Sequence, residues 1–213
     1  MQSLIILGAG PHAQEMADIV AQINGRQPTW QLEGFLVPAA EAGRVGQVTG
    51  SGMPVLGTYA DLTDYPDAVF AMEYGCGRPP VARERVVSLV ASSAFVAYTA
   101  RIGAGCVIYP GCFVGHNAVL GDRVFVLSGA VINHDCHLED EVTVCTNVSL
   151  AGHVYVARGA YLGQACTIRQ HLRIGQESLV GMGSVVVKDV APHAVVMGNP
   201  ARERDTERRR PGN

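Results

Sequence analysis

The chain has 213 residues, of which 48% are hydrophobic and 16% are charged, and its formal net charge at pH 7 is −3. This composition indicates a globular protein with a substantial core, and the charge gives no support for a nucleic-acid-binding surface. The sequence contains no apolar stretch long enough to predict a membrane span. The first ten residues lack the basic flank and cleavage site of a signal peptide, so we expect a cytoplasmic protein.

The chain opens with an apolar run at residues 4–7, a turn containing Gly8 and Gly10, and apolar residues at helical spacing over 16–23. This order of strand, glycine turn and helix can bind phosphate. Glycines let backbone N–H groups approach an anion, and a helix N-terminus favours negative charge. The pattern Gly8-x-Gly10-x-x-Ala13 also occurs in turns that bind nothing. Phosphate binding and a purely structural turn therefore both stay open.

The next elements predict a small α/β domain. We expect strands at 33–37, 55–57 and 68–72, a glycine-rich loop at 39–52, one or two helical turns at 59–62 and a helix at 83–90. The second strand ends without the acidic residue that a dinucleotide-binding oxidoreductase uses to hold a ribose, which argues against NAD. Residues 1–98 are thus predicted to form a small Rossmann-like βαβ domain, too short for a complete dinucleotide fold.

Residues 102–190 have an aliphatic residue at every sixth position, fifteen times in succession from Ile102 to Val186. This is the hexapeptide signature of a β-helix, in which three short strands make one turn and equivalent positions stack every eighteen residues. We expect an α/β plus all-β protein, with a left-handed parallel β-helix of about five coils over residues 99–201. Residues 202–213 are polar and rich in arginine, and are predicted to be a disordered tail.

The repeat also sorts side chains between the inside and the outside of the coils. The aliphatic residues point inward, so histidines and carboxylates must project outward. Cys106, Cys112, Cys136 and Cys166 occupy the small-residue position of their hexads, and no C-x-x-C pair is present. We therefore expect small buried thiols in the reduced state rather than disulfides or metal ligands.

Histidines recur at the spacing of one coil. His116 and His134 are eighteen residues apart, and so are His153 and His171. Stacked imidazoles of this kind can bind zinc or transfer protons, although no third histidine joins either column. His134 is followed by Asp135, and a neighbouring carboxylate can fix the imidazole tautomer and raise its basicity. A solvent-facing corner whose polar residues only satisfy the turn is the alternative.

The corner at residues 132–135, the hexads around it and the closing segments 181–190 and 198–201 resemble the hexapeptide acyltransferases. With its N-terminal glycine turn, the chain is similar to bacterial sugar acetyltransferases of the sialic-acid O-acetyltransferase type. That group includes N-acetyltransferases for nucleotide-linked 4-amino sugars. The resemblance covers nearly the whole chain.

The resemblance implies a role for each matching residue. His134 would be the general base and Asp135 its orienting acid, with Asn133 beside them in the substrate site. The N-terminal domain would bind a nucleotide-sugar. The residues implied for its phosphates or base are Gly8, Gly10, Pro11 and His12. Acetyl-CoA would lie along the β-helix between neighbouring subunits of a homotrimer. Its implied contacts are Thr143, Gly152, Gly181 and Met182.

The chain departs from these relatives at three places. Thr143 stands where histidine is common, Pro11 replaces the second glycine of the turn, and no acidic residue follows the second strand. These departures leave open a nucleotide other than uridine. We expect N-acetylation of a nucleotide-linked amino sugar, with O-acetylation as the alternative and no metal required. A metal-dependent hydratase with zinc at the His116 and His134 columns, and a non-catalytic nucleotide-binding scaffold, are the hypotheses from other classes.

Overall fold

The computed structural model describes residues 1–77 and 79–204 of the chain. The described chain divides into two compact units. One unit contains residues 1–92 and 104–107, and the other contains residues 93–103 and the chain from residue 108 onward. The predicted tail begins with Arg202 and Glu203, which form strand β23, and its residues 205–213 lie outside the described residues. Within the described residues, no helix has both the length and the apolar character needed to cross a membrane.

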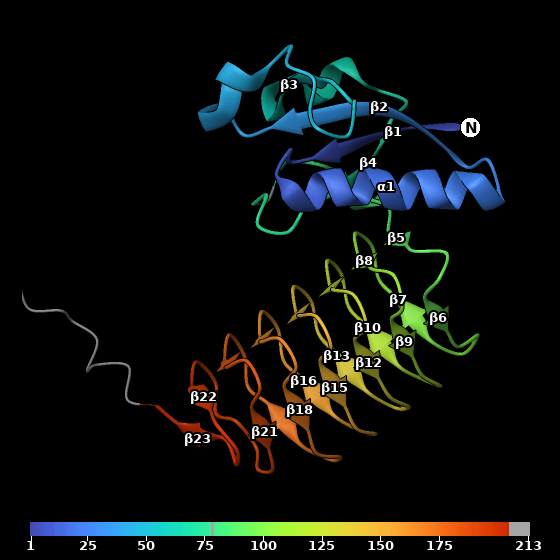
Figure 1. Cartoon of the computed structure of the whole chain (residues 1–213). Coiled ribbons are helices and arrows are strands. Elements are labelled where there is room, and N and C mark those ends of the chain that lie inside the picture. The colour runs from blue at the N-terminus through green and yellow to red at the C-terminus, as the bar shows by residue number, and fades with distance from the viewer. Residues whose placement is uncertain (78, 205–213) are drawn as a thin grey trace, which may run out of the picture. The chain divides into compact units, whose positions relative to one another are not determined.

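The N-terminal unit contains a parallel sheet of four strands in the order β3-β2-β1-β4 (Figure 1). Its elements are β1 (Gln2–Leu7), α1 (Pro11–Arg26), β2 (Trp30–Val37), β3 (Val55–Thr58) and β4 (Val69–Met72). This order is that of the first four strands of the doubly wound order 3-2-1-4-5-6. Its core includes the fully buried side chains of Ile5, Leu36 and Phe70.

After β2, the connections of this unit contain short 3₁₀ helices. They are η1 (Ala39–Arg44), η2 (Tyr59–Asp64) and η3 (Arg83–Arg85). The prediction of a helix over 83–90 is wrong, because after η3 the β-branched Val86 and Val87 pair with Phe70 of β4 and the chain then forms β5 (Leu89–Val90). The expected loop at 39–52 contains η1, and Arg44 Nη2 donates a 2.7 Å hydrogen bond to the Ala9 carbonyl.

The second unit is a parallel β-solenoid whose short strands form three columns (Figure 1). We name each column by an early strand. The β7 sheet contains β7 (Arg101–Ile102), β10 (Val119–Leu120), β13 (His137–Leu138), β16 (Tyr155–Val156) and β19 (Arg173–Ile174). The β8 sheet contains β5, β8 (Val107–Ile108), β11 (Phe125–Val126), β14 (Thr143–Val144), β17 (Tyr161–Leu162), β20 (Leu179–Val180), β22 (Val195–Met197) and β23 (Arg202–Glu203). The β9 sheet contains β6 (Phe95–Val96), β9 (Phe113–Val114), β12 (Val131–Ile132), β15 (Ser149–Leu150), β18 (Thr167–Ile168) and β21 (Val185–Val186).

The coil count of five is wrong, because the solenoid extends beyond residues 102–190 at both ends. Strand β6 precedes Ile102, and strand β22 follows Val190 and pairs in parallel with β20. The β9 sheet accordingly has six strands and the β8 sheet has eight. At the C-terminal end β22 leaves the eighteen-residue spacing, since Val195 pairs with Leu179. At the N-terminal end the spacing continues, because Val96 of β6 lies six residues before Ile102 and pairs with Val114, so the predicted repeat began one coil too late.

The interior and the corners follow the predicted pattern. Leu120, Ile132, Leu138 and Leu150 are all within 2% of complete burial. Cys106, Cys112, Cys136 and Cys166 are buried among such residues and are not disulfide-bonded. At the corner between the β9 and β7 sheets, one residue per coil takes a left-handed conformation. These residues are Asn117, Asp135, His153 and His171, with φ between 55° and 62°. Among residues other than glycine, Asn, Asp and His are the ones enriched in that conformation.

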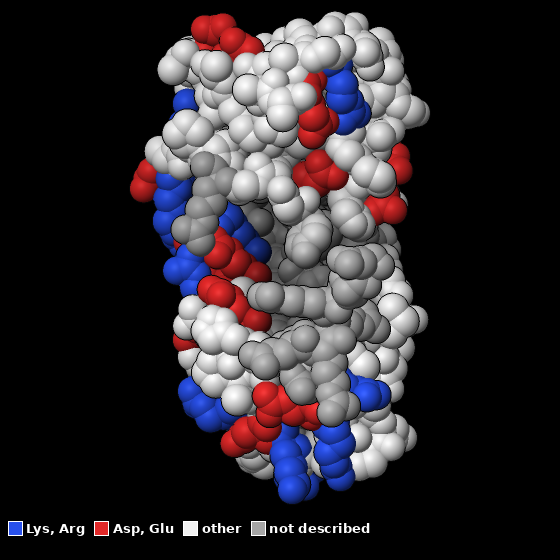
Figure 2. Space-filling model, turned by 90° about the vertical axis from the view of Figure 1, so that its left-hand side faces the viewer, with Lys and Arg blue, Asp and Glu red and all other residues white. Residues whose placement is uncertain are grey.

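Charged side chains are mixed on the surface. Figure 2 shows acidic and basic groups intermingled on the face that it presents. Within the β-helix, Glu141 lies 3.2 Å from Arg158 and also pairs with Arg123. Interspersed charge of this kind fits a soluble surface better than a site for a polyanion.

Candidate active site

His134 and Asp135 lie at the corner between β12 and β13 and form a hydrogen-bonded pair. The distance from His134 Nδ1 to Asp135 Oδ2 is 2.8 Å. The left-handed backbone of Asp135, with φ of 57°, turns the chain so that both side chains project outward. Their side chains are 57% and 36% exposed. Because Nδ1 bonds to the carboxylate, Nε2 is the nitrogen that can exchange a proton with a ligand.

Asp135 is held from the coils on both sides. Asn117 Nδ2 donates a 3.2 Å hydrogen bond to Asp135 Oδ1, and His153 Nε2 lies 3.7 Å from Asp135 Oδ2. The hydrogen bond from His134 and then that from Asn117 lower the pKa of Asp135 below its usual range, and the charge of His153 acts in the same direction. Asp135 therefore stays ionised and can stabilise an imidazolium on His134.

His153 is a neighbour of this pair that sequence reasoning missed. The rings of His134 and His153 are 5.2 Å apart and perpendicular, and His153 stacks on His171 at 4.7 Å. The spacing of histidines alone pairs His134 with His116, one coil earlier. In the structure His116 hydrogen-bonds to the Thr99 hydroxyl through Nδ1. The spacing of eighteen from Asp135 to His153 was the available signal.

The same group offers three possible metal ligands. The ligand atoms of His134, Asp135 and His153 lie within 4.8 Å of one another, and all three residues are exposed. This set differs from the His116 and His134 columns that the zinc hypothesis requires. His134 Nδ1 already bonds to the carboxylate, so only its Nε2 would be available to an ion.

Gly152 and Asn133 shape the corner around His134. A Cβ atom on Gly152 would lie 2.6 Å from His134 Cε1 and 2.7 Å from Nε2, so the absence of a side chain leaves space for the imidazole. Asn133 Nδ2 donates to the Leu150 carbonyl at 2.8 Å. Gly152, predicted as a contact of acetyl-CoA, thus lies directly against the candidate base.

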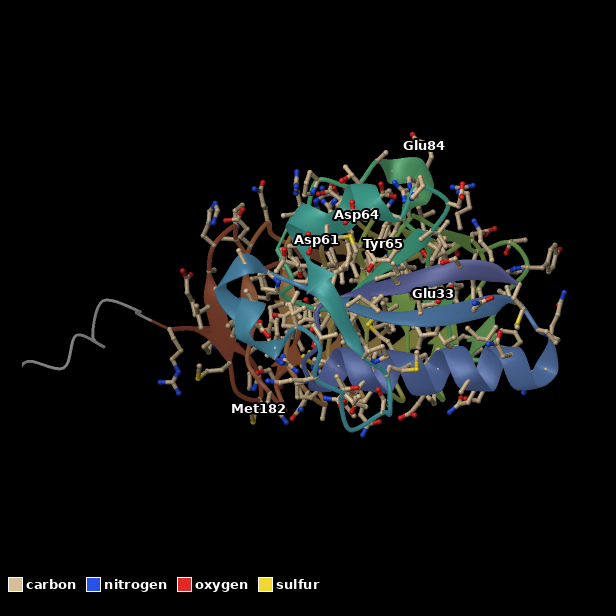
Figure 3. The ribbon with its side chains drawn as sticks, turned by 90° about the horizontal axis from the view of Figure 1, so that it is seen from above. Glu33, Asp61, Asp64, Tyr65, Glu84 and Met182 are labelled. Carbon is tan, nitrogen blue, oxygen red and sulfur yellow. The ribbon has the colours of Figure 1, made fainter. Side chains whose placement is uncertain are left out.

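Gly181 and Met182 lie at a different corner, where they line a groove of about 380 Å³. Its other lining residues are Tyr161, Gly163, Gln164, Leu179, Val180 and Met197. Met182 is 75% exposed and projects from its corner (Figure 3). Thr143 pairs with Tyr161 on the neighbouring strand of the β8 sheet and is itself only 7% exposed. We call this site the Met182 groove.

The His134 corner and the Met182 groove lie at opposite ends of the short strands of the β9 sheet. The chain passes the Met182 corner before it enters β21, and equivalent residues of each coil reach the His134 corner after that sheet. Across the sheet, one six-residue face separates these two rows of corners, a span of up to ~20 Å for an extended chain. Within one chain, therefore, the two places do not form a single pocket.

The N-terminal turn holds a carboxylate where a phosphate was predicted. Glu73 accepts hydrogen bonds from Gly10 N to Oε2 and from Ala13 N to Oε1, each 3.1 Å long. Pro11 is the first residue of α1. His12 Nδ1 lies 3.1 Å from Glu15. Of the predicted binding residues here, Gly8 and Gly10 lie directly against the Glu73 side chain.

Comparison with known proteins bears on the repeat and on the fold. Residues 99–134 match the family described as "Bacterial transferase hexapeptide (six repeats)". A mutant of perosamine N-acetyltransferase from Caulobacter crescentus, solved in complex with CoA and GDP-perosamine, is 24% identical with a TM-score of 0.85, over 96% of this chain and 98% of that one. The acetyltransferase domain of PglB from Neisseria gonorrhoeae is 25% identical with a TM-score of 0.80, over 96% of this chain and all of that one.

Curated relatives match a shorter segment. The acyl-[acyl-carrier-protein]–UDP-N-acetylglucosamine O-acyltransferase of Pseudomonas aeruginosa is 47% identical over 58 residues, which are 27% of this chain and 22% of that protein. The chain therefore spans about a fifth of the length of the curated relatives that it matches, 22% in that case. Together these comparisons confirm the resemblance to hexapeptide-repeat acyltransferases.

Proposed function

We propose that this chain, a hexapeptide-repeat protein of the bacterial transferase type, transfers an acetyl group from acetyl-CoA to the amino group of a nucleotide-linked amino sugar. The observation that carries the proposal is the His134–Asp135 pair, hydrogen-bonded at 2.8 Å on an exposed corner of the β-helix. The fold is shared with a perosamine N-acetyltransferase solved with CoA and GDP-perosamine. Transfer to a sugar hydroxyl is the alternative within the same chemistry.

The proposed reaction needs one base and no covalent enzyme intermediate. The acceptor nitrogen attacks the thioester carbonyl carbon, the carbon–sulfur bond breaks, and the thiolate of CoA leaves. His134 Nε2 takes the proton that the nitrogen loses, while Asp135 stabilises the imidazolium through Nδ1. Holding both substrates in place removes much of the entropic barrier to their reaction.

We further propose that the acetyl-CoA site is shared between copies of the chain in a homotrimer. The Met182 groove is apolar and suits the extended arm of CoA, with Gly181 and Met182 in its lining and Thr143 paired with its lining residue Tyr161. In the same chain the groove lies across the β9 sheet from His134 and further along the coils, so we propose that a second copy brings a groove to each base. Gly152 would then lie on the side of the His134 imidazole that faces acetyl-CoA, where its lack of a side chain leaves space for the ring.

Exposed aromatic side chains on the β9 sheet support such an assembly. Phe95 and Phe113 stack with ring centroids 5.0 Å apart, and they are 57% and 37% exposed. Exposed apolar surface of this kind marks protein contacts. Because this sheet separates the two candidate sites, a copy packed here would approach both rows of corners.

The left-handed sense of the β-helix and a cytoplasmic location remain predictions.

The test is an acetyl-transfer assay on purified protein with His134→Gln, read as release of free CoA thiol. The substrates are nucleotide-linked amino sugars, with the corresponding hydroxy sugars as the oxygen acceptors. We expect kcat to fall by about 10²- to 10⁴-fold, the usual contribution of a general base. The matched control is His116→Gln, one coil earlier and bonded to Thr99, which should change kcat less than His134→Gln. Equal activity of the two variants would remove His134 as the base.

Further measurements separate the other function classes. Calorimetry should show acetyl-CoA binding to both variants, whereas a nucleotide-binding scaffold would bind nucleotide and not CoA. Metal analysis of active protein tests the hydratase hypothesis, which requires zinc at stoichiometric level. Sedimentation should give a trimer, and Phe113→Lys should yield monomers with little activity.

A further inference from the structure

The two glycines of the N-terminal turn make room for a side chain from elsewhere in the unit. A Cβ atom on Gly8 would lie 2.1 Å from Glu73 Oε2, and one on Gly10 would lie 2.4 Å from Glu73 Oε1. Glu73 follows strand β4 and is 63 residues from Gly10 in sequence. The glycine pattern is therefore explained by a carboxylate of the chain itself, without any ligand.

This carboxylate takes the position that a phosphate would need. Backbone N–H groups at a helix N-terminus are what attracts an anion there. At the N-terminus of α1 the N–H groups of Gly10, which precedes the helix, and Ala13 already bond to Glu73 at 3.1 Å. A phosphate brought to the turn would lose these donors and would be repelled by a like charge. The nearby cation, Arg44, bonds to Glu41 at 2.6 Å and to the Ala9 carbonyl.

The groups beside Glu73 suit a different part of a nucleotide. An ionised carboxylate accepts hydrogen bonds and has about four acceptor positions, of which the two backbone bonds use two. Tyr74, the next residue, is 46% exposed, and the His12 ring lies 6.3 Å from its ring. An acceptor next to exposed aromatic rings matches a nucleobase, which has N–H donors on its edge and a face that stacks.

We propose that Glu73 determines which part of the substrate the N-terminal unit binds, with the nucleobase edge at Glu73, its ring against Tyr74, and the diphosphate away from the glycine turn. This rests on the proposed function, because it assumes a nucleotide-linked substrate. Guanine has two adjacent donors, N1–H and the exocyclic amine, that can meet one carboxylate. Uracil has one N–H between two carbonyl oxygens, which the carboxylate repels. A guanine nucleotide is accordingly the preferred substrate class.

The experiment is calorimetry with guanosine, uridine and pyrophosphate on the full chain. Wild-type protein should bind guanosine more tightly than uridine, and pyrophosphate should not compete with guanosine. Glu73→Gln should weaken guanosine binding by about 10- to 100-fold, as expected when hydrogen bonds to a charged acceptor are lost. Tyr74→Ala should also weaken it while Glu73 stays in place. The control is Glu84→Gln in η3, which lies well away from α1 (Figure 3) and should leave guanosine binding unchanged.

Three results would overturn the inference. They are competition of pyrophosphate with guanosine for wild-type protein, unchanged guanosine affinity in Glu73→Gln, and no guanosine binding to wild-type protein. A melting curve for each variant shows that it is folded, and Tyr74→Ala supplies a result if Glu73→Gln unfolds. Failure here is distinct from failure of the proposed function, because acetyl transfer lost in His134→Gln would still establish the acetyltransferase.

Discussion

The two units of the molecule specify their backbones in different ways. In the β-helix, strands from β7 to β21 pair residue i with residue i+18 without a shift, as Val119 pairs with His137 and Val131 with Ser149. In the N-terminal sheet the register shifts between Leu4 and Ile5 and again between Phe35 and Leu36. One coil therefore predicts the next, whereas the N-terminal unit depends on contacts between distant residues such as Gly10 and Glu73.

The largest effect should come from breaking the stack of the β-helix at a middle coil. Leu150 is fully buried between its equivalents, Ile132 and Ile168. Leu150→Ala should lower the free energy of unfolding by about 2–5 kcal/mol, since it leaves a cavity that the neighbouring coils cannot close. Urea unfolding measures the change. The outward-facing neighbour gives the control, because Ser149→Ala should stay within about 0.5 kcal/mol, and equal losses would refute the inward stack.

The same difference between the units decides what the sequence could predict. The hexad period gave the buried column, the burial of the cysteines and the outward position of His134, because each depends only on the neighbouring coils. It did not give the last coil, where β22 departs from the strict spacing. The first coil was missed although Val96 of β6 continues the period before Ile102. His153 was missed for a narrower reason, since its partner one coil away is an aspartate rather than a histidine.

The N-terminal unit shows why the rest was not predictable. Gly8 and Gly10 were interpreted through their local sequence, which allows a phosphate, but the group that fills the turn comes from Glu73. The segment at 83–90 has a helical pattern, yet pairing of Val86 with Phe70 made its later residues extended. In both cases a contact distant in the sequence overrode a local preference.

The second prediction compares a glycine in each unit. A Cβ atom on Gly175 of the β-helix would lie 2.3 Å from the backbone nitrogen of Pro192, whereas Gly25 in α1 has nothing within 4 Å. Gly175→Ala should destabilise by about 1–3 kcal/mol through overpacking, because backbone cannot move aside as a side chain can. Gly25→Ala should stabilise by about 0.5–1 kcal/mol. Thermal melting measures the stability change of each variant. If both variants were stabilised, or both destabilised, the comparison would be contradicted.

The third prediction separates packing from chemistry within the β-helix. Gly152→Ala places a methyl group against the His134 ring, which is exposed and can rotate away. The melting temperature should therefore change little, while kcat falls by about 10- to 100-fold because the base is displaced. Steady-state kinetics with saturating acetyl-CoA measures the loss. A normal kcat would show that the imidazole works in a position the methyl group does not reach.

The smallest effect concerns the titration of Asp135. Hydrogen bonds from His134 and then Asn117 lower the pKa of Asp135, so its interactions favour the folded state above its ordinary pKa and are lost as pH falls through the lowered value. Asn117→Ala removes the 3.2 Å bond and should move the pKa of Asp135 back upward, with little change in stability because the group is exposed. NMR titration of the Asp135 carboxyl carbon measures it. The control is Asn147→Ala, which alters a left-handed residue of another corner, with φ of 57°, and should leave the titration unchanged. If Asn117→Ala has no effect either, the ionised state of Asp135 depends on the two histidines alone, and the coil before His134 contributes nothing to the proposed base.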